Sequence, residues 1–238
     1  MQRGRRREDA RRGPRIEPPA AILAAGGRGE RAAAGSQAQP KQFRLLGGRP
    51  LITWSLAALA DYGCEPLVVV VPEHRVETAR ELATPWPRAI VTSGGPTRQD
   101  SVARGLEHVG DATRVVVHDA ARPFIDAGLI GRVIGALDDH DGALPAQPVE
   151  ETLKVVDGDR VVETIDRTRL WRAQTPQAFV TTALRRAHER SADASATDDA
   201  QLIELAGGRV AVVKGDRRNV KITFDEDFEL AEAMLRTE

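Results

Sequence analysis

Short, wholly apolar runs alternate with stretches of helical periodicity along most of the chain. The runs at 20–25 and 67–71 contain only Ala, Ile, Leu and Val, which is typical of strands buried on both faces of a sheet. Further predicted strands lie at 89–92, 114–118, 142–146 and 210–213, and predicted helices at 50–60, 74–83, 97–109, 126–138, 181–189, 198–206 and from residue 225 onward. Strands separated by helices indicate βαβ units, and therefore an α/β fold with a mostly parallel, doubly wound sheet.

One segment breaks this rhythm. Residues 151–156 and 160–165 flank the turn Asp157-Gly158-Asp159 and alternate as the strands of a hairpin do. An isolated two-stranded hairpin is only marginally stable in water. We therefore expect a β-arm at about 149–166 that packs against a second subunit.

Composition narrows the class of protein. A length of 238 residues with 41% hydrophobic residues fits one α/β domain, which we place at 19–238. Lys plus Arg (34) nearly balance Asp plus Glu (35), so no overall field draws the chain to nucleic acid or to an anionic membrane. No apolar run approaches the roughly 20 residues of a membrane-spanning helix. The single cysteine, Cys64, excludes an internal disulfide and fits a reducing compartment, so we expect a cytoplasmic protein.

The beginning of the chain is strongly basic. Its first 15 residues carry seven arginines and no apolar run, unlike a secretory signal. We expect residues 1–18 to be a disordered Arg-rich tail, with a nucleic-acid arm or an organelle transit peptide as the alternatives.

A polar loop follows the first predicted strand, at the sheet edge where open α/β sheets bind ligands. It contains Gly26-Gly27-Arg28-Gly29-Glu30-Arg31, and Lys41 follows. Glycines let backbone N–H groups approach phosphate oxygens, and Arg and Lys neutralise the charge of a triphosphate. The spacing is not that of a Walker loop, and Gly27-x-Gly29-x-x-Ala32 is only a weak match to the dinucleotide-binding fingerprint. An ordinary surface loop is the remaining alternative.

Two further loops stand at predicted strand ends. Residues 94–101 include Gly95 and Ser101 and lead into a helix, so they form either a ligand-binding turn or a capped βα turn. The loop His118-Asp119-Ala120-Ala121-Arg122-Pro123 offers a carboxylate and a guanidinium, which face a ligand or form an ion pair with each other. We expect His118 itself to be structural.

Taken in order, these motifs resemble the 2-C-methyl-D-erythritol 4-phosphate cytidylyltransferases of the non-mevalonate isoprenoid pathway. The resemblance extends roughly from residue 20 to the C-terminus. The matching segments are Ala24-Ala25-Gly26 with Gly29 and Arg31, Pro40-Lys41-Gln42, the loop 118–123, Asp166-Arg167, Leu170-Trp171, Gln174-Thr175-Pro176-Gln177, Thr197-Asp198 and Val220-Lys221-Ile222-Thr223. The resemblance implies a Rossmann-like nucleotidyltransferase fold whose protruding β-hairpin is exchanged in a homodimer.

The same resemblance implies a reaction. The cytidylyl group of CTP would pass to a sugar-alcohol phosphate and release pyrophosphate, with Mg²⁺ carried mainly by the CTP phosphates and no metal ligand from the protein. Attack on the α-phosphorus builds negative charge, so fixed cations supply most of the catalysis. The residues implied are Arg31, Lys41, Arg167 and Lys221 for catalysis, Ala24, Ala25, Gly26, Gly29, Gly95, Ser101 and Ala120 for the nucleotide, and Asp119, Arg122, Thr152, Arg167, Thr197 and Lys221 for the acceptor. Thr152 and Arg167 would serve the neighbouring subunit's site.

Some positions depart from the family pattern and leave alternatives. The loop has an extra residue near Gly27 and is lengthened between Arg31 and Lys41, and Pro96 stands where the family often has an acidic residue. Leu23 replaces a proline that is common in the family, and the resulting segment Ile22-Leu23-Ala24 resembles the ribitol-5-phosphate cytidylyltransferases, which are the main alternative. A nicotinamide-binding dehydrogenase and a noncatalytic nucleotide-sensing module are more distant ones.

Overall fold

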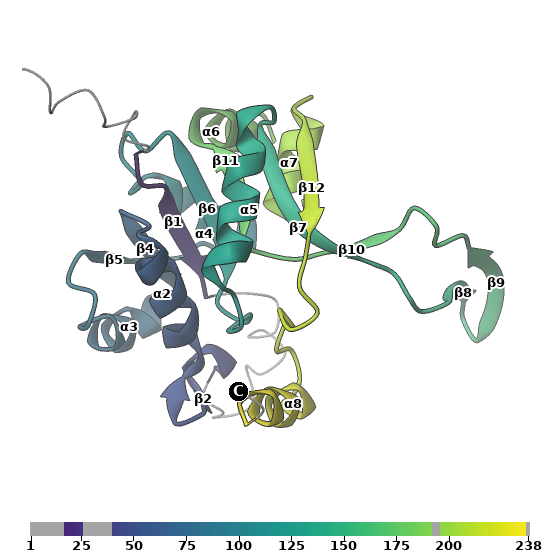
Figure 1. Ribbon diagram of the computed structural model, residues 1–238, viewed down its shortest axis with the longest axis horizontal. Coiled ribbons are helices and arrows are strands. Elements are labelled where there is room, and N and C mark those ends of the chain that lie inside the picture. The colour runs from purple at the N-terminus through teal and green to yellow at the C-terminus, as the bar shows by residue number, and fades with distance from the viewer. Residues whose placement is uncertain (1–16, 26–39, 192–195, 237–238) are drawn as a thin grey trace, which may run out of the picture.

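The computed structural model describes residues 17–25, 40–191 and 196–236. Within these residues, an eight-stranded sheet forms the centre, in the order β10-β7-β11-β6-β1-β4-β5, with β12 pairing on β7 (Figure 1). Its strands are β1 (Ala20–Ala24), β4 (Leu67–Val71), β5 (Ala89–Ser93), β6 (Arg114–Asp119), β7 (Gly142–Pro148), β10 (Trp171–Ala173), β11 (Gln177–Val180) and β12 (Val210–Lys214).

Most strands of the sheet run in one direction. β1 pairs in parallel with β4 and β6, β4 with β5, and β7 with β12. β11 lies antiparallel between β6 and β7, and β10 is antiparallel to β7. The mostly parallel sheet predicted from the sequence is therefore confirmed, and the two antiparallel strands belong to the chain's return from the arm.

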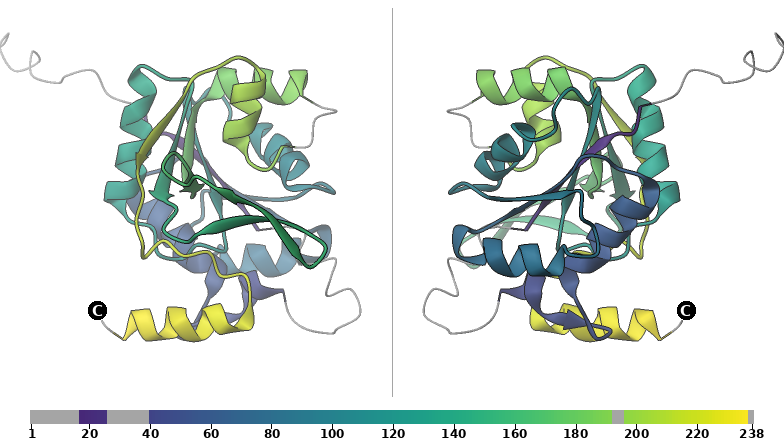
Figure 2. Two further views of the ribbon diagram at one scale, coloured as in Figure 1. Left: turned by 90° about the vertical axis from the view of Figure 1, so that its right-hand side faces the viewer. Right: turned by 90° about the vertical axis from the view of Figure 1, so that its left-hand side faces the viewer.

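Helices cover both faces of this sheet, as Figure 2 shows. Apolar side chains of α2, α3 and α5 pack on one face, and those of α4, α6 and α7 on the other. The helices are α2 (Leu51–Tyr62), α3 (Val76–Leu82), α4 (Arg98–Leu106), α5 (Ala127–Gly135), α6 (Thr181–Arg190), α7 (Asp199–Leu205) and α8 (Asp225–Leu235), with 3-10 turns η1 (Lys41–Phe43), η2 (Glu73–Arg75) and η3 (Ala136–Asp138).

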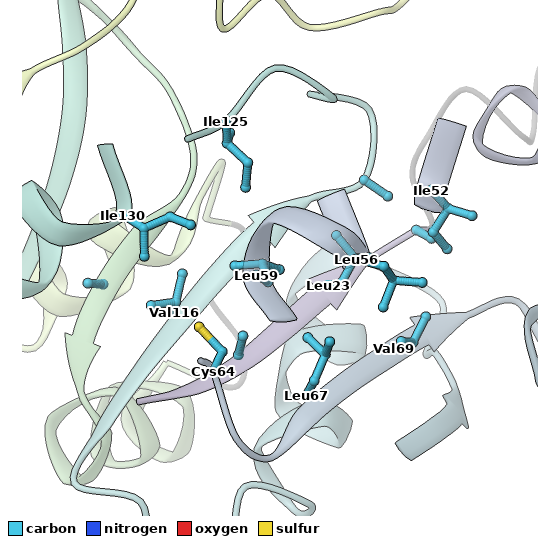
Figure 3. Packing of buried hydrophobic residues seen from close by; sticks show 14 of the residues in the cluster. Leu23, Ile52, Leu56, Leu59, Cys64, Leu67, Val69, Val116, Ile125 and Ile130 are labelled. Atoms are coloured by element: carbon cyan, nitrogen blue, oxygen red, sulfur yellow. The ribbon is translucent and has the colours of Figure 1, made fainter. Parts of the chain in front are cut away.

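The central strands are apolar on both sides because each side meets a helix layer. Leu23 packs in the cluster with Leu56 and Leu59 of α2 (Figure 3). Its neighbour Ile22 belongs to the cluster with Val102 of α4 on the other face. Aliphatic residues of this kind fill such a core at crystal-like density. The helix α4 comes close to the sheet at Gly105, where an added Cβ would lie 2.7 Å from Ile22 Cγ2.

A third small cluster forms beyond the sheet edge. The short strands β2 (Leu45–Leu46) and β3 (Arg49–Pro50) pair with each other, and Leu46 packs with Phe228 of α8. Figure 1 places α8 beside β2, so the C-terminal helix supports the segment that follows Lys41. The sequence did not predict this small hairpin, because each strand has only two residues.

The predicted arm is present as a hairpin. β8 (Leu153–Asp157) and β9 (Arg160–Ile165) pair antiparallel and project from the body (Figure 1). Four valines on it are exposed, among them Val156 at 55% and Val161 at 54%. Its role as a contact between subunits stays a prediction.

Element boundaries moved by a few residues from those expected. The helices predicted at 74–83 and 126–138 each divide into an α-helix and a 3-10 turn, and the helix predicted to start at Pro50 starts at Leu51 with Pro50 as its N-cap. Most of the predicted tail, 1–16, and most of the first polar loop, 26–39, lie outside the described residues. In the part of the chain that is described, no helix is long and apolar enough to cross a membrane.

Candidate functional site

The ends of β1 and β6 bring the first predicted nucleotide contacts together. Ala24 is paired in register with Asp119, and the Ala120 N–H donates to the Ala24 carbonyl at 2.9 Å. Ala25 is fully buried and donates its N–H to the Val70 carbonyl at 2.8 Å. Because these strands are parallel, their carboxyl ends meet at one edge, as predicted for a ligand site.

The turn between β5 and α4 contributes Gly95 to the same edge, and the first turn of α4 contributes Ser101. The Gly95 N–H donates to Ser101 Oγ at 3.1 Å, and the Ser101 hydroxyl donates to the Thr97 carbonyl at 2.9 Å. An added Cβ at Gly95 would lie 2.3 Å from Asp100 Cβ, so only glycine fits. Thr97 caps α4 in a capping box with Asp100, which fixes where the helix begins.

Asp119, at the end of β6, lies between two cations. Its Oδ2 accepts from Lys221 Nζ at 2.8 Å, and its Oδ1 accepts from Arg98 Nε at 3.1 Å. Arg98 also donates through Nη1 to Asp199 Oδ2 at 2.6 Å. Burial alone would raise the pKa of Asp119, but Arg98 and Lys221 hold it well below its ordinary value, so the carboxylate is charged.

The backbone of Asp119 is held by a hydrogen-bond chain through His118. The Asp119 N–H donates to Thr175 Oγ1 at 3.1 Å, and Thr175 Oγ1 lies 3.0 Å from His118 Nδ1. His118 Nε2 lies 3.0 Å from the Arg122 carbonyl, which can only accept, so Nε2 carries the proton and Nδ1 accepts from Thr175. Burial lowers the pKa of His118 to about 4, which keeps the ring neutral. The expectation that His118 is structural agrees with these contacts.

Arg122 and its neighbours hold the segment that carries Lys221. Arg122 Nη1 donates to the Asn219 carbonyl at 2.8 Å, and Asn219 Nδ2 donates to the Thr175 carbonyl at 2.7 Å. Gln174 Nε2 donates to the Asp216 carbonyl at 2.8 Å. The irregular stretch after β12 is therefore fixed by side chains from the loop after β6 and from the 174–177 segment, which explains how it is ordered without forming a helix or strand.

Thr197 lies just before α7 and is connected to the same cluster. Its N–H and hydroxyl both donate to Gln201 Oε1, at 2.7 and 3.1 Å. Asp198 caps α7 by accepting from the Gln201 N–H at 3.0 Å. The next residue, Asp199, binds Arg98, so the Thr197 loop is tied to Asp119 through one guanidinium.

The remaining predicted site residues divide into three groups. Lys41 begins the turn η1 and is half-buried. Thr152 and Arg167 lie at the base of the arm, where Arg167 donates to the Glu150 carbonyl, and the structure does not bring them to Asp119 within one chain. Gly26, Gly29 and Arg31 lie outside the described residues.

Arg98 and Asp199 lie in the candidate site but were given no role from the sequence, and Thr175 was named only as part of the matching segment 174–177. Arg98 was hidden inside a turn chosen for its glycines and serine. A signal existed: Arg98 is the first residue of α4, and a cation is disfavoured at a helix N-terminus unless carboxylates compensate it. Asp199 carried no such signal, because an acidic residue in the first turn of a helix is ordinary.

The described residues offer no protein cage for a metal ion. Among them, no group of three or more His, Cys, Asp or Glu side chains is placed to hold one. Asp119 and Asp199, the buried carboxylates of the site, are engaged by Arg98 and Lys221.

Known proteins match this chain in sequence and in fold. A family model described as 2-C-methyl-D-erythritol 4-phosphate cytidylyltransferase (IspD) matches residues 20–237. The chain belongs to this family. The solved 2-C-methyl-D-erythritol 4-phosphate cytidylyltransferase of Thermus thermophilus is 37% identical, with a TM-score of 0.78 over 92% of this chain and 99% of that one. The family match also confirms the nucleotidyltransferase fold predicted from the resemblance.

Longer relatives also match. The bifunctional enzyme IspD/IspF of Rhodospirillum rubrum is 45% identical over 226 residues, covering 92% of this chain and 57% of that protein. The structure of the bifunctional IspDF of Campylobacter jejuni matches with a TM-score of 0.74 and 27% identity, over 89% of this chain and 53% of that one. The chain thus spans little more than half the length of these bifunctional relatives.

Proposed function

We propose that this chain is a CTP-dependent cytidylyltransferase. It transfers the cytidylyl group of CTP to 2-C-methyl-D-erythritol 4-phosphate, giving 4-diphosphocytidyl-2-C-methyl-D-erythritol and pyrophosphate in the synthesis of isoprenoid precursors. The observation that carries the proposal is the Lys221–Asp119–Arg98 cluster at the carboxyl edge of the sheet, beside the Gly95–Ser101 turn. The family match supports the choice of substrates.

The chemistry requires a fixed positive environment. A phosphate oxygen of the acceptor attacks the α-phosphorus of CTP, a new P–O bond forms, and the bond from the α-phosphorus to the bridging oxygen breaks. The electron pair leaves with pyrophosphate. Negative charge grows on the equatorial and leaving oxygens, so preorganised cations lower the barrier. Lys41 and Arg31 take this role at the triphosphate, and Lys221 holds the attacking phosphate.

The nucleotide and the acceptor occupy neighbouring parts of the edge. We propose that the nucleotide is bound by Ala24, Ala25, Gly26, Gly29, Gly95, Ser101 and Ala120. Asp119, Arg122 and Thr197 lie around the sugar alcohol, where charged and hydroxyl side chains can bond its hydroxyl groups. In this proposal, Mg²⁺ is carried mainly by the CTP phosphates.

Thr152 and Arg167 complete the site of a neighbouring subunit in this proposal. Their position at the base of the arm, away from Asp119 in the same chain, fits a homodimer in which arms are exchanged. The exposed valines of the hairpin support such a contact, since an isolated hairpin gains little from exposing them. Sedimentation of the purified chain would give the oligomeric state directly. The cytoplasmic location stays a prediction.

A pyrophosphate-release assay tests the activity. Purified protein with CTP and Mg²⁺ should turn over 2-C-methyl-D-erythritol 4-phosphate much faster than ribitol 5-phosphate, and omission of either substrate is the control. Turnover with ribitol 5-phosphate alone would select the ribitol enzyme. A thermal shift with NAD but none with CTP would select the dehydrogenase.

A further inference from the structure

Arg98 joins three parts of the site through one side chain. Its backbone starts α4, directly after the turn that holds Gly95. Its guanidinium reaches Asp119 at the end of β6 and Asp199 at the start of α7, at 3.1 and 2.6 Å. A planar guanidinium suits this because its N–H groups point in fixed directions toward two separate carboxylates.

The environment makes these contacts strong. The Arg98 side chain is 21% exposed, that of Asp119 is 13% exposed and that of Asp199 only 1%. Charges in such a place interact more strongly than on the surface, and removing one partner leaves the other charge buried and uncompensated. Loss of Arg98 would therefore take the guanidinium from both carboxylates, leaving Lys221 beside Asp119 and His188, at 3.5 Å, beside the buried Asp199.

Asp119 has two oxygens with different partners. Oδ1 is engaged by Arg98 and Oδ2 by Lys221, whose side chain is 46% exposed. The guanidinium thus decides which way the carboxylate faces, and the carboxylate decides where the ammonium lies. Without Arg98, Oδ1 would lose its partner, and Lys221 could bind either oxygen in more than one geometry.

We propose that Arg98 is a positioning residue that orients Asp119 so that its second oxygen holds the Lys221 ammonium at the place of the acceptor phosphate. This inference rests on the proposed function for its kinetic consequence. Arg98 acts through Asp119 and Lys221 and does not itself touch the reacting atoms. A purely structural alternative exists, in which Arg98 serves only to neutralise the buried Asp199.

A set of variants separates the two roles. Asp199→Asn removes the structural demand on Arg98 and leaves its bond to Asp119. Adding Arg98→Gln to Asp199→Asn removes one cation and one buried carboxylate together, so the core keeps its charge balance and the protein can fold. Adding Arg98→Lys instead supplies one ammonium for the one remaining carboxylate. The control is Arg114→Gln at the opposite end of β6, where Arg114 pairs with the exposed Asp138.

Steady-state kinetics with both substrates gives the main result. Relative to Asp199→Asn alone, the Arg98→Gln double variant should raise KM for the acceptor by about tenfold or more, with the dissociation constant for CTP, measured by calorimetry, changed by less than about threefold. The Arg98→Lys double variant should recover most of that loss, and Arg114→Gln should match the wild type. Equal acceptor KM values for Asp199→Asn and its Arg98→Gln double variant would overturn the proposal.

A crystal structure of the Arg98→Gln double variant gives a second, activity-independent result. The 2.8 Å contact from Asp119 Oδ2 to Lys221 Nζ should be replaced by a longer distance or by two side-chain conformers. An unchanged contact would overturn the proposal even if the kinetics moved. Failure of the proposed function would show differently, as absence of turnover in the wild type, and the crystal structure would still decide the role of Arg98.

Discussion

The buried ring of His118 makes the stability of the site loop depend on pH. Burial lowers its pKa from 6.5 to about 4 in the folded chain. Between these two pH values, His118 binds a proton in the unfolded chain but not in the folded one. The free energy of unfolding must therefore fall as the pH is lowered through this range. The loss is about 2 kcal/mol at pH 5.0 and about 3 kcal/mol below pH 4, from 1.4 kcal/mol per pKa unit.

The geometry agrees with this direction. In the neutral ring, Nε2 donates to the Arg122 carbonyl and Nδ1 accepts from Thr175. A proton on Nδ1 would remove that acceptor and place a charge where the ring has no contact with water. Asp119 does not contribute to the change between pH 7.5 and pH 5.0. Because its pKa is lowered in the folded chain, its contribution to the free energy of unfolding is lost only as the pH falls below the ordinary aspartate range.

Thermal unfolding measured at pH 7.5 and pH 5.0 checks this prediction. For a chain of this size, about 2 kcal/mol corresponds to a Tm lower by roughly 4–8 °C at pH 5.0. His118→Gln should be less stable at pH 7.5, and its Tm should change much less between the two pH values. His108→Gln, at an exposed histidine, should keep the wild-type dependence. If His118→Gln loses as much Tm as the wild type between pH 7.5 and 5.0, the linkage to His118 is refuted.

Three further substitutions and one labelling experiment test other parts of the chain. Lys41→Ala should lower kcat by about 100-fold or more and change the CTP dissociation constant much less, because the charge it meets is greatest in the transition state; a loss confined to KM would contradict this. Ser101→Ala should weaken CTP binding by about tenfold in calorimetry, because the Gly95 N–H loses its acceptor. Cys64, whose pKa burial raises to about 12, should react with a thiol reagent only after denaturation, and fast labelling of the native chain would contradict its burial. Phe228→Ala should lower the free energy of unfolding by about 3 kcal/mol in urea titrations, whereas a loss below about 0.5 kcal/mol would show that α8 is not fixed by this ring.

The sheet and its helices were predictable because burial on both faces imposes a strong pattern. A run such as Leu67–Val71 has no solvent side, so every position is apolar and the strand is visible without any partner. The strand pair Leu45–Leu46 and Arg49–Pro50 was not visible, because its stability comes from α8, far away in the sequence. The pattern of residues around 45–50 contains no sign of this contact with α8.

The residues of the candidate site also divide into those that the sequence could predict and those that it could not. Asp119 and Arg122 stand at a strand end, a place that can be found from the strand itself, and the resemblance added Lys221. The position of Arg98 at a helix start hinted at a carboxylate partner but did not say which one. Its partner Asp199 lies 101 residues away in the sequence, at the start of another helix, and the two meet only in the folded chain. Only the fold reveals that one guanidinium serves both carboxylates.

The charge balance of this cluster explains how Lys221 can be both fixed and available. Two carboxylates, Asp119 and Asp199, face two cations, Arg98 and Lys221, so the four side chains together carry no net charge. An ammonium has three N–H donors, and Asp119 takes one of them through Oδ2. Because Asp119 shares its charge with Arg98, it holds Lys221 in place without neutralising it fully, and the half-exposed ammonium keeps donors directed outward for a phosphate. If Asp119 faced Lys221 without Arg98, the carboxylate would lose its fixed direction and the ammonium would no longer be held at one place. The guanidinium of Arg98 therefore sets how well the acceptor phosphate is bound.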